Sequence, residues 1–369
     1  MTPAARPILL FAAADPGGAS AVLPVVTLLA ARGGAVAVLD HGFLGRNAPS
    51  DLMRLASPSE GDFGDWLEDT GVGGLCFGTS LADHLPLSLA RAARQRGIPV
   101  ACVLDNWMNY RARLEMDGGP LLIPDLYAVM DDKARDEALA EGVPPACLRV
   151  TGHPGLAGLA REIATADSGW RNGVRARLGL GGPGRELIAF IGEPVIKDQG
   201  EGPETPSWRG YTERDALALL CRELQPRAKD LDVAIVPHPR DDVAALDDLW
   251  QQCRGGLGGG LVDGVSGRQV VQVADRVAGM ASIMLYEAWL QGKPVLSMQP
   301  GLVRDDLARS VRRPGIIPVT RPEQAEAAVA GWLAAGPGEI RPDCLRHGEA
   351  PAVLADLMQH MMERTNGEA

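Results

Sequence analysis

A histidine and an arginine follow a buried strand in the second half of the chain. The run 233–240, with the sequence VAIVPHPR, ends in His238 and Arg240, and its two prolines limit the freedom of the backbone there. In open α/β sheets, ligands bind beyond the carboxyl ends of the strands. An imidazole and a guanidinium in that position can hold a diphosphate. We therefore predict that His238 and Arg240 contact phosphate, with a purely structural histidine as the alternative.

A second group of residues suits the same ligand. Four residues stand at the start of an expected helix and can offer backbone amides to an anion: Gly279, Met280, Ala281 and Ser282. Ser282 is a suitable N-cap, and the positive end of the helix dipole stabilises phosphate oxygens. Further along this helix, the Glu287 carboxylate can accept hydrogen bonds from both hydroxyls of a ribose. The alternative is an ordinary capped helix with a solvated glutamate.

Another strand of the same half, 187–191, ends in Gly192 and Glu193, which are further candidates for ligand contact. The segment from Lys197 to Gly210, rich in Gly and Pro, follows directly. Because it starts beyond a strand end, we predict that it is a mobile cover over the site, with a surface insertion of no function as the alternative.

Two glycines open the first helix of the chain. Asp15 and Pro16 follow the first strand and lead into Gly17 and Gly18, where the lack of a side chain lets the backbone approach a ligand. The spacing is neither a dinucleotide fingerprint nor a lysine-bearing P-loop, so NAD and ATP are disfavoured as ligands. A tight turn between strand and helix is the alternative.

The first half also holds candidates for a general base. Asp105 follows the strand 100–104, and a carboxylate there can accept a proton from an acceptor hydroxyl. We take Asp105 as the first candidate, with Asp83, His84 and Asp15 as the others. The alternative is that Asp105 only caps a helix. Trp107, two residues on, either stacks on a sugar face or belongs to the core.

Strand-like runs alternate with helix-length segments along the whole chain, which is typical of parallel sheets covered by helices. Two such series indicate two Rossmann-like domains of the α/β class. We predict a first domain over 1–155 on the acceptor side, a second over 156–350 that binds the nucleotide sugar, and a terminal helix over 351–369 that can return to the first domain. The glycine-rich run from Arg254 to Gly260 breaks the pattern and is expected outside the strands.

Composition limits the partners. The chain of 369 residues has a formal net charge of −11, which disfavours nucleic acids and anionic membranes as general ligands. No stretch is long and apolar enough to span a bilayer, and no signal peptide is recognised. The six cysteines lack the spacing of a zinc site or a disulfide framework, so no metal is expected. A cytoplasmic location follows as the expectation.

Several of these segments resemble the GT-B superfamily. The run 287–296, with the sequence EAWLQGKPVL, the pair His238 and Pro239, and the linking run 150–152, VTG, are similar to its nucleotide half and hinge, and shorter matches lie at 78–80, GTS, and 97–100, GIPV. The superfamily contains nucleotide-sugar glycosyltransferases and the non-hydrolysing UDP-N-acetylglucosamine 2-epimerases. The resemblance implies two Rossmann-like domains facing a central cleft, with Ser282 and its neighbouring amides at the diphosphate, Glu287 at the ribose and His238 at a phosphate.

The chain departs from the epimerases at three places. They carry an arginine and a lysine in the first loop, Gly-Asp-Thr after the fourth strand and Ser-Gly-Gly at the helix start, where this sequence has DPGG at 15–18, GTS at 78–80 and ASI at 281–283. These differences favour a metal-independent glycosyltransferase that moves a sugar from a UDP- or CMP-linked donor to a small-molecule or glycan hydroxyl, with no other cofactor. The alternatives are an epimerase and a non-catalytic nucleotide-sugar-binding protein, and a homodimer is left open.

Overall fold

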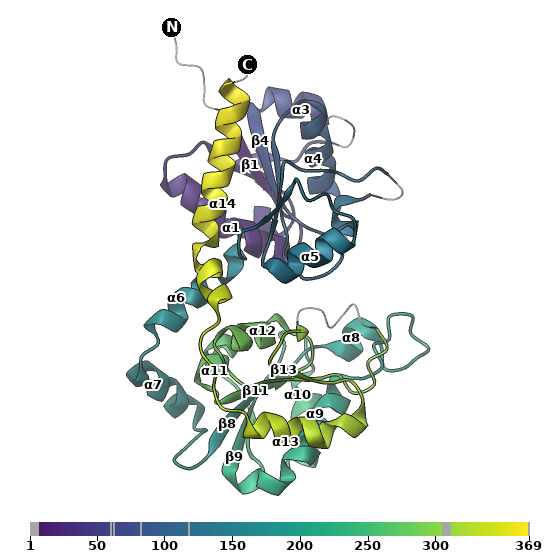
Figure 1. Ribbon diagram of the computed structural model, residues 1–369, viewed down its shortest axis with the longest axis vertical. Helices are drawn as coiled ribbons and strands as arrows, with labels where there is room; N and C mark the ends of the chain where they lie inside the picture. The colour runs from purple at the N-terminus through teal and green to yellow at the C-terminus, as the bar shows by residue number, and fades with distance from the viewer. Residues whose placement is uncertain are drawn as a thin grey trace. The chain divides into compact units, whose positions relative to one another are not determined.

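The computed structural model describes residues 7–59, 61, 63–81, 83–116, 119–304 and 311–367. The chain divides into two compact units (Figure 1). Unit 1 holds the residues up to Arg161 together with those from Asp343 onward, and unit 2 runs over Glu162–Pro342. Each unit contains one parallel sheet with helices around it.

The sheet of unit 1 has seven parallel strands in the order β3-β2-β1-β4-β5-β6-β7. Its strands are short and apolar, as expected where helices cover the sheet. They are β1 (Ile8–Ala12), β2 (Val36–Asp40), β3 (Met53–Ala56), β4 (Val72–Gly78), β5 (Val100–Val103), β6 (Leu126–Val129) and β7 (Leu148–Val150).

The helices of unit 1 bury apolar side chains against these strands, and all but the last of them connect strands of the sheet. They are α1 (Pro16–Ala31), α2 (Gly42–Asn47), α3 (Phe63–Asp69), α4 (Leu85–Gln95), α5 (Asp132–Ala140) and α14 (Pro342–Gly367), with short 3-10 turns at Ala112–Leu114 and Pro154–Leu156. α6 (Ala157–Thr165) crosses the division between the units.

The sheet of unit 2 repeats the same arrangement with six parallel strands, in the order β10-β9-β8-β11-β12-β13. The strands are β8 (Glu186–Ile191), β9 (Leu231–Val236), β10 (Gly258–Leu261), β11 (Arg276–Gly279), β12 (Val295–Met298) and β13 (Ile316–Val319). In both sheets, the first four strands of the unit lie side by side in the order third, second, first, fourth, which is the Rossmann order. The predicted fold class, α/β with two Rossmann-like units, is confirmed.

The helices of unit 2 pack around a core that includes Phe190, Trp250 and Trp332. They are α7 (Ser168–Leu178), α8 (Val195–Gln199), α9 (Glu213–Leu224), α10 (Val243–Cys253), α11 (Gly267–Val273), α12 (Ile283–Leu290) and α13 (Ala325–Ala334), with 3-10 turns at Gln225–Asp230 and Pro322–Gln324. Among the described residues, none of the helices combines the length and apolar character that a bilayer crossing requires.

The glycine-rich run 254–260 was wrongly expected to lie outside the strands. Its second part belongs to β10, which pairs with β9 along the edge of the sheet. Gly259 has a φ of +101°, and a Cβ there would lie 2.1 Å from the carbonyl oxygen of Val233. Glycine at this position therefore allows two backbones to approach, which apolar patterning along the sequence does not report.

The predicted domain boundaries differ from the division in the structure. The first boundary lies after Arg161 instead of residue 155, and the chain returns to unit 1 at Asp343 instead of residue 351. α14 begins at Pro342 and contains Pro351 within it, where the sequence pattern had placed a helix start. In Figure 1, α14 runs alongside the sheet of unit 1, and Leu354 and Met358 join the same core cluster as Val22 of α1.

Replacing Leu354 by alanine should lower the free energy of unfolding by about 2–5 kcal/mol, the usual loss for deleting a buried leucine side chain. Leu354 is 0% exposed, whereas its neighbour Val353 is 39% exposed on the same helix. Val353→Ala is therefore the matched control, with an expected change of about 0.5 kcal/mol. Urea denaturation measures both variants. Equal losses would mean that α14 does not complete the core of unit 1.

Candidate functional site

The carboxyl ends of the strands carry the candidate residues in both units. In unit 1 the strand order reverses between β1 and β4, and in unit 2 it reverses between β8 and β11. Loops at such a reversal diverge and leave a crevice, which is where ligands bind in open α/β sheets. Asp15, Asp83 and Asp105 follow β1, β4 and β5 in unit 1. Glu193, His238 and Ser282 follow β8, β9 and β11 in unit 2.

Asp105 lies in a buried polar network. Its Oδ1 accepts hydrogen bonds from Thr79 Oγ1 at 2.6 Å and from Arg113 Nη1 at 2.6 Å, and Arg113 Nη1 is 2.9 Å from Thr79 Oγ1. The side chains of Arg113 and Asp105 are 6% and 12% exposed. The network fixes one carboxylate oxygen, which leaves Oδ2 as the oxygen that can accept a proton.

The two glycines after β1 meet this network. A Cβ on Gly17 would lie 2.1 Å from Asp105 Oδ2, and one on Gly18 would lie 2.8 Å from the backbone oxygen of Thr79. Both glycines are thus required by close packing against unit 1 itself. This gives them a physical reason separate from the predicted approach of a ligand, which stays a prediction.

A histidine and an aspartate form a second polar pair at the same edge. His41 Nε2 lies 2.7 Å from Asp83 Oδ2, while Asp83 Oδ1 accepts a hydrogen bond from the Leu85 amide at 3.0 Å. Both side chains are about one-third exposed. Asp83 was a predicted base; His41, its partner after β2, was missed. His84 and Asp15 instead stand at the N-caps of α4 and α1, and neither makes a side-chain cap bond.

Trp107 belongs to the core of unit 1. It is buried, stacks on His153 and donates a hydrogen bond from Nε1 to Asp131 Oδ2 at 2.9 Å. Burial lowers the pKa of His153, so this ring is neutral at physiological pH. The backbone amide of His153 donates to His347 Nδ1 of α14 at 2.9 Å. These contacts join the chain returning in α14 to the loop after β5.

In unit 2, a glutamate occupies the amides predicted to bind phosphate. Glu193 Oε1 accepts a hydrogen bond from the Ala281 amide at 2.5 Å, and Oε2 lies 3.8 Å from Arg209 Nη1. Burial raises the pKa of Glu193, while the amides of Met280, Ala281 and Ser282 and the charge of Arg209 oppose that shift. The amides at the helix start before α12 are therefore occupied in this structure by the protein's own carboxyl group.

The His238 loop is held by short-range bonds. Asp241 Oδ2 accepts from the His238 amide at 2.6 Å, and His238 Nδ1 accepts from the Arg240 amide at 3.2 Å. The ring proton is then on Nε2, which can donate to a phosphate oxygen. Arg240 makes a bidentate pair with Asp198 at 2.5 and 2.7 Å, so its guanidinium is already engaged. A Cβ on Gly192 would lie 2.8 Å from Asp241 Oδ2, so Gly192 is required by packing.

The environment of Glu287 differs from both interpretations of the sequence. Its carboxylate accepts two hydrogen bonds from Arg268 of α11, at 3.1 and 2.8 Å, and its side chain is 4% exposed. It is therefore neither solvated nor unpaired, and a ribose would have to share it with Arg268. Ser282 caps α12, accepting from the Met284 amide at 3.3 Å, as predicted for a helix start.

The segment 197–210 packs on unit 2. Arg209 reaches Glu193, and its backbone oxygen accepts a hydrogen bond from the Val303 amide at 2.9 Å. A Cβ on Gly210 would lie 1.8 Å from the backbone oxygen of Gly301. The segment thus brings a cation to the strand edge, and its role as a cover stays a prediction.

In sequence, the chain matches no protein-family model and no curated protein. In structure, it is similar to the UDP-GlcNAc 2-epimerase of Neisseria meningitidis bound to UDP-GlcNAc, with a TM-score of 0.62, 13% identity and coverage of 95% of this chain and 99% of that one. For the UDP-GlcNAc 2-epimerase of Methanocaldococcus jannaschii in complex with UDP-GlcNAc and UDP, the TM-score is 0.60 and the identity 12%, with coverage of 96% of this chain and 99% of that one. For MurG of Acinetobacter baumannii, the TM-score is 0.55 and the identity 13%, with coverage of 96% of this chain and 99% of that one. The predicted GT-B fold is confirmed.

Proposed function

We propose that this chain is an enzyme that binds a UDP-linked N-acetyl sugar and inverts its configuration at carbon 2. The observation that carries the proposal is the pair His41 and Asp83 at the carboxyl edge of a Rossmann sheet whose fold is shared with UDP-GlcNAc 2-epimerases. The epimerase reading, an alternative from the sequence, thus gains support over transfer. Its support is chemical as well as architectural, because each unit by itself carries groups suited to one part of the reaction.

Proton transfer is assigned to unit 1. Inversion at carbon 2 requires that its proton leaves from one face and that a proton returns to the other. The electron pair of the broken C2–H bond forms a C1=C2 double bond as the C1–O bond to UDP breaks, and UDP adds back to C1 when the proton returns to C2. Imidazole exchanges protons near neutral pH, and a carboxylate bonded to one ring nitrogen fixes the orientation of the other. His41, held by Asp83 at 2.7 Å, has this arrangement. Asp105, with Oδ1 fixed by Arg113 and Thr79, is a second group able to take or return a proton through Oδ2.

Nucleotide recognition is assigned to unit 2. The amides before α12 hold a carboxylate in this structure, and the same amides suit the oxygens of a diphosphate. His238 Nε2 and the half-buried Arg209 add two donors at the same strand edge. No metal enters this assignment, because helix amides and cationic side chains supply the compensation for the phosphate charge.

Glycosyl transfer is the second candidate, and two observations favour it. The fold is shared with the glycosyltransferase MurG, and Asp105 is held in one orientation as a base for an acceptor hydroxyl requires. A non-catalytic binding protein is the third, favoured by the occupation of the α12 amides by Glu193.

One experiment separates these candidates. The protein is incubated with UDP-N-acetylglucosamine in D2O and followed by proton NMR. The proposal predicts the C2 epimer, with loss of the C2 proton signal as deuterium enters from solvent. Release of UDP without exchange at C2 would instead support hydrolysis or transfer, and it would reject the epimerase. Binding with neither reaction would also reject the epimerase, and a screen of acceptors would then separate a transferase from a binding protein.

Glu193→Gln should tighten the binding of a UDP-sugar by about 10-fold or more, since it removes a negative charge from the amides that the diphosphate needs. The pH dependence has a definite sign. A bound diphosphate raises the pKa of Glu193 further, so binding takes up a proton, and the affinity of the native protein should fall as the pH rises through the raised pKa of this group.

Calorimetry with a UDP-sugar between about pH 4.5 and 8 measures both effects. A UDP-sugar is used instead of UDP because its diphosphate has no proton to lose in this range. The introduced glutamine side chain does not titrate, so the slope should become smaller in Glu193→Gln. Arg209→Gln, which removes the nearby cation, should weaken binding at every pH. Weaker binding in Glu193→Gln would show that this carboxylate belongs to the ligand's own contacts.

A further inference from the structure

A large pocket lies at the other edge of the sheet of unit 2, beside the amino ends of β8 and β11. Its volume is about 1150 Å³, and its walls include Arg171, Arg175, Gln291 and Lys293. Since ligands of open α/β sheets bind at the carboxyl edge, this pocket is separate from the nucleotide site proposed above. Its size suits a whole small molecule.

Three cations of this pocket surround the end of α11. Arg171 Nη1 donates to the Gln272 backbone oxygen at 3.1 Å, Lys293 Nζ donates to the same oxygen at 3.1 Å and to Ala274 O at 2.7 Å, and Arg175 donates to Val273 O. α11 has no glycine cap, so its last carbonyls need such donors. Arg171 and Arg175 lie one turn apart on α7, which places both on one face of that helix.

This arrangement holds more positive charge than the helix end requires. The end of a helix carries roughly −0.5 elementary charge, and Asp275, paired with Arg175 at 2.7 Å, adds one negative charge. Within the described part of the chain, neither Arg171 nor Lys293 has a carboxylate at ion-pair distance. Two cations that share one carbonyl oxygen repel each other, and Asp275, whose charge attracts Lys293, is already paired with Arg175.

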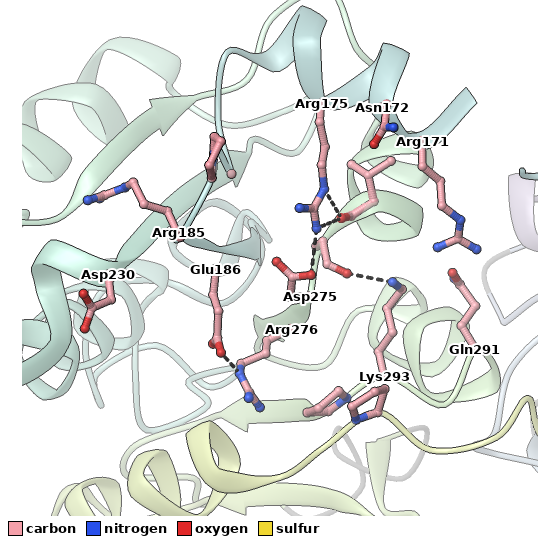
Figure 2. Close-up of a pocket in the computed structure, with 18 of the residues that line it drawn as sticks. Arg171, Asn172, Arg175, Arg185, Glu186, Asp230, Asp275, Arg276, Gln291 and Lys293 are labelled. Carbon is pink, nitrogen blue, oxygen red and sulfur yellow. Dashed lines mark hydrogen bonds and ion pairs between the residues drawn. The ribbon is translucent and has the colours of Figure 1, made fainter. Parts of the chain in front are cut away.

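The pKa of Lys293 is consistent with this excess of positive charge. Burial and the neighbouring charge of Arg171 lower the pKa of Lys293 to about 8, while Asp275 opposes this shift. Figure 2 shows the ends of Arg171, Gln291 and Lys293 gathered on one side of the pocket. Guanidinium, ammonium and amide groups together are the donors that proteins use for phosphate.

We propose that Arg171, Lys293 and Gln291 form a binding site for the phosphate group of a small molecule, distinct from the nucleotide site. A doubly charged phosphate matches an excess of roughly +1.5 better than a single carboxylate does. The group is either inorganic or carried by a sugar phosphate, and the two sources share this chemistry.

The test is calorimetry on the full chain, with inorganic phosphate and N-acetylglucosamine 1-phosphate titrated in parallel. Arg171→Gln and Lys293→Met should each weaken binding about 10- to 100-fold. Arg222→Gln, which removes an exposed cation elsewhere on unit 2, and Arg209→Gln, which removes the cation at the carboxyl edge, should change it less than about twofold. The tighter of the two ligands identifies the source of the phosphate.

A second readout does not depend on affinity. Near pH 8 a bound anion favours the charged form of Lys293, so binding should take up protons, as measured in buffers of different ionisation enthalpy. That uptake should be lost in Lys293→Met, whose folding is checked by circular dichroism. The proposal is overturned if neither ligand binds at about 10 mM, if Arg222→Gln weakens binding equally, or if only Arg209→Gln weakens it.

Discussion

His41→Gln is expected to slow proton exchange at carbon 2 of the UDP-sugar by about 10²- to 10⁴-fold, while the affinity for the UDP-sugar changes less than about twofold. The glutamine keeps a hydrogen bond to Asp83 and nearly the same volume, but it cannot carry a proton between pH 5 and 8. The loss should therefore appear in kcat. The rate of deuterium entry at carbon 2, followed by NMR, measures it.

Asp83→Asn tests the same pair from its other side. Asp83 contacts His41 through Oδ2 and the Leu85 amide through Oδ1, so an asparagine can keep the second bond while it changes the tautomer or orientation of the ring. A smaller loss than that of His41→Gln is expected, because the imidazole remains. His84→Gln is the matched control, as His84 stands beside Asp83 at the start of α4. Equal losses at His84 and His41 would mean that neither imidazole is the proton carrier.

His41 shows which parts of the site could be predicted from the sequence and which could not. The strand before it was predicted, and the rule that ligands gather at strand ends applies to β2 as well as to β5. The signal was therefore present, but the partner of His41 lies 42 residues away along the chain. Periodicity locates strands and their ends, whereas it does not pair side chains from two different loops.

The same limit explains the outcome in unit 2. Strands β8, β9, β11 and β12, the helix start at Ser282 and the buried surroundings of Glu287 were visible as local patterns, whereas β10 and β13 were not predicted. That Glu193 fills the amides before α12, and that Arg268 holds Glu287, depends on contacts 88 and 19 residues apart in sequence. A charged group is available to a ligand only if no such partner binds it, and these partners are brought together by tertiary packing.

Asp105→Asn is expected to lower turnover of the UDP-sugar by about 10²- to 10⁴-fold with its affinity retained, because an amide oxygen cannot accept the proton that Oδ2 can. The substitution also leaves the buried Arg113 without a carboxylate, which should lower the free energy of unfolding by about 1–3 kcal/mol. A loss of rate alone would therefore not separate a proton acceptor from a structural ion pair.

Thr79→Val separates a catalytic role of Asp105 from a structural one. Valine keeps the shape of the buried threonine and removes one donor to Asp105 Oδ1, at 2.6 Å, while the carboxylate and Arg113 remain. It should cost a similar free energy of unfolding, about 1–3 kcal/mol, yet reduce turnover by less than about 10-fold. Urea denaturation and the NMR assay measure the two quantities on the same samples. If Thr79→Val and Asp105→Asn slow turnover to the same extent, Asp105 positions the loop after β5 and takes no proton, and the proton must then reach His41 or a group outside this network.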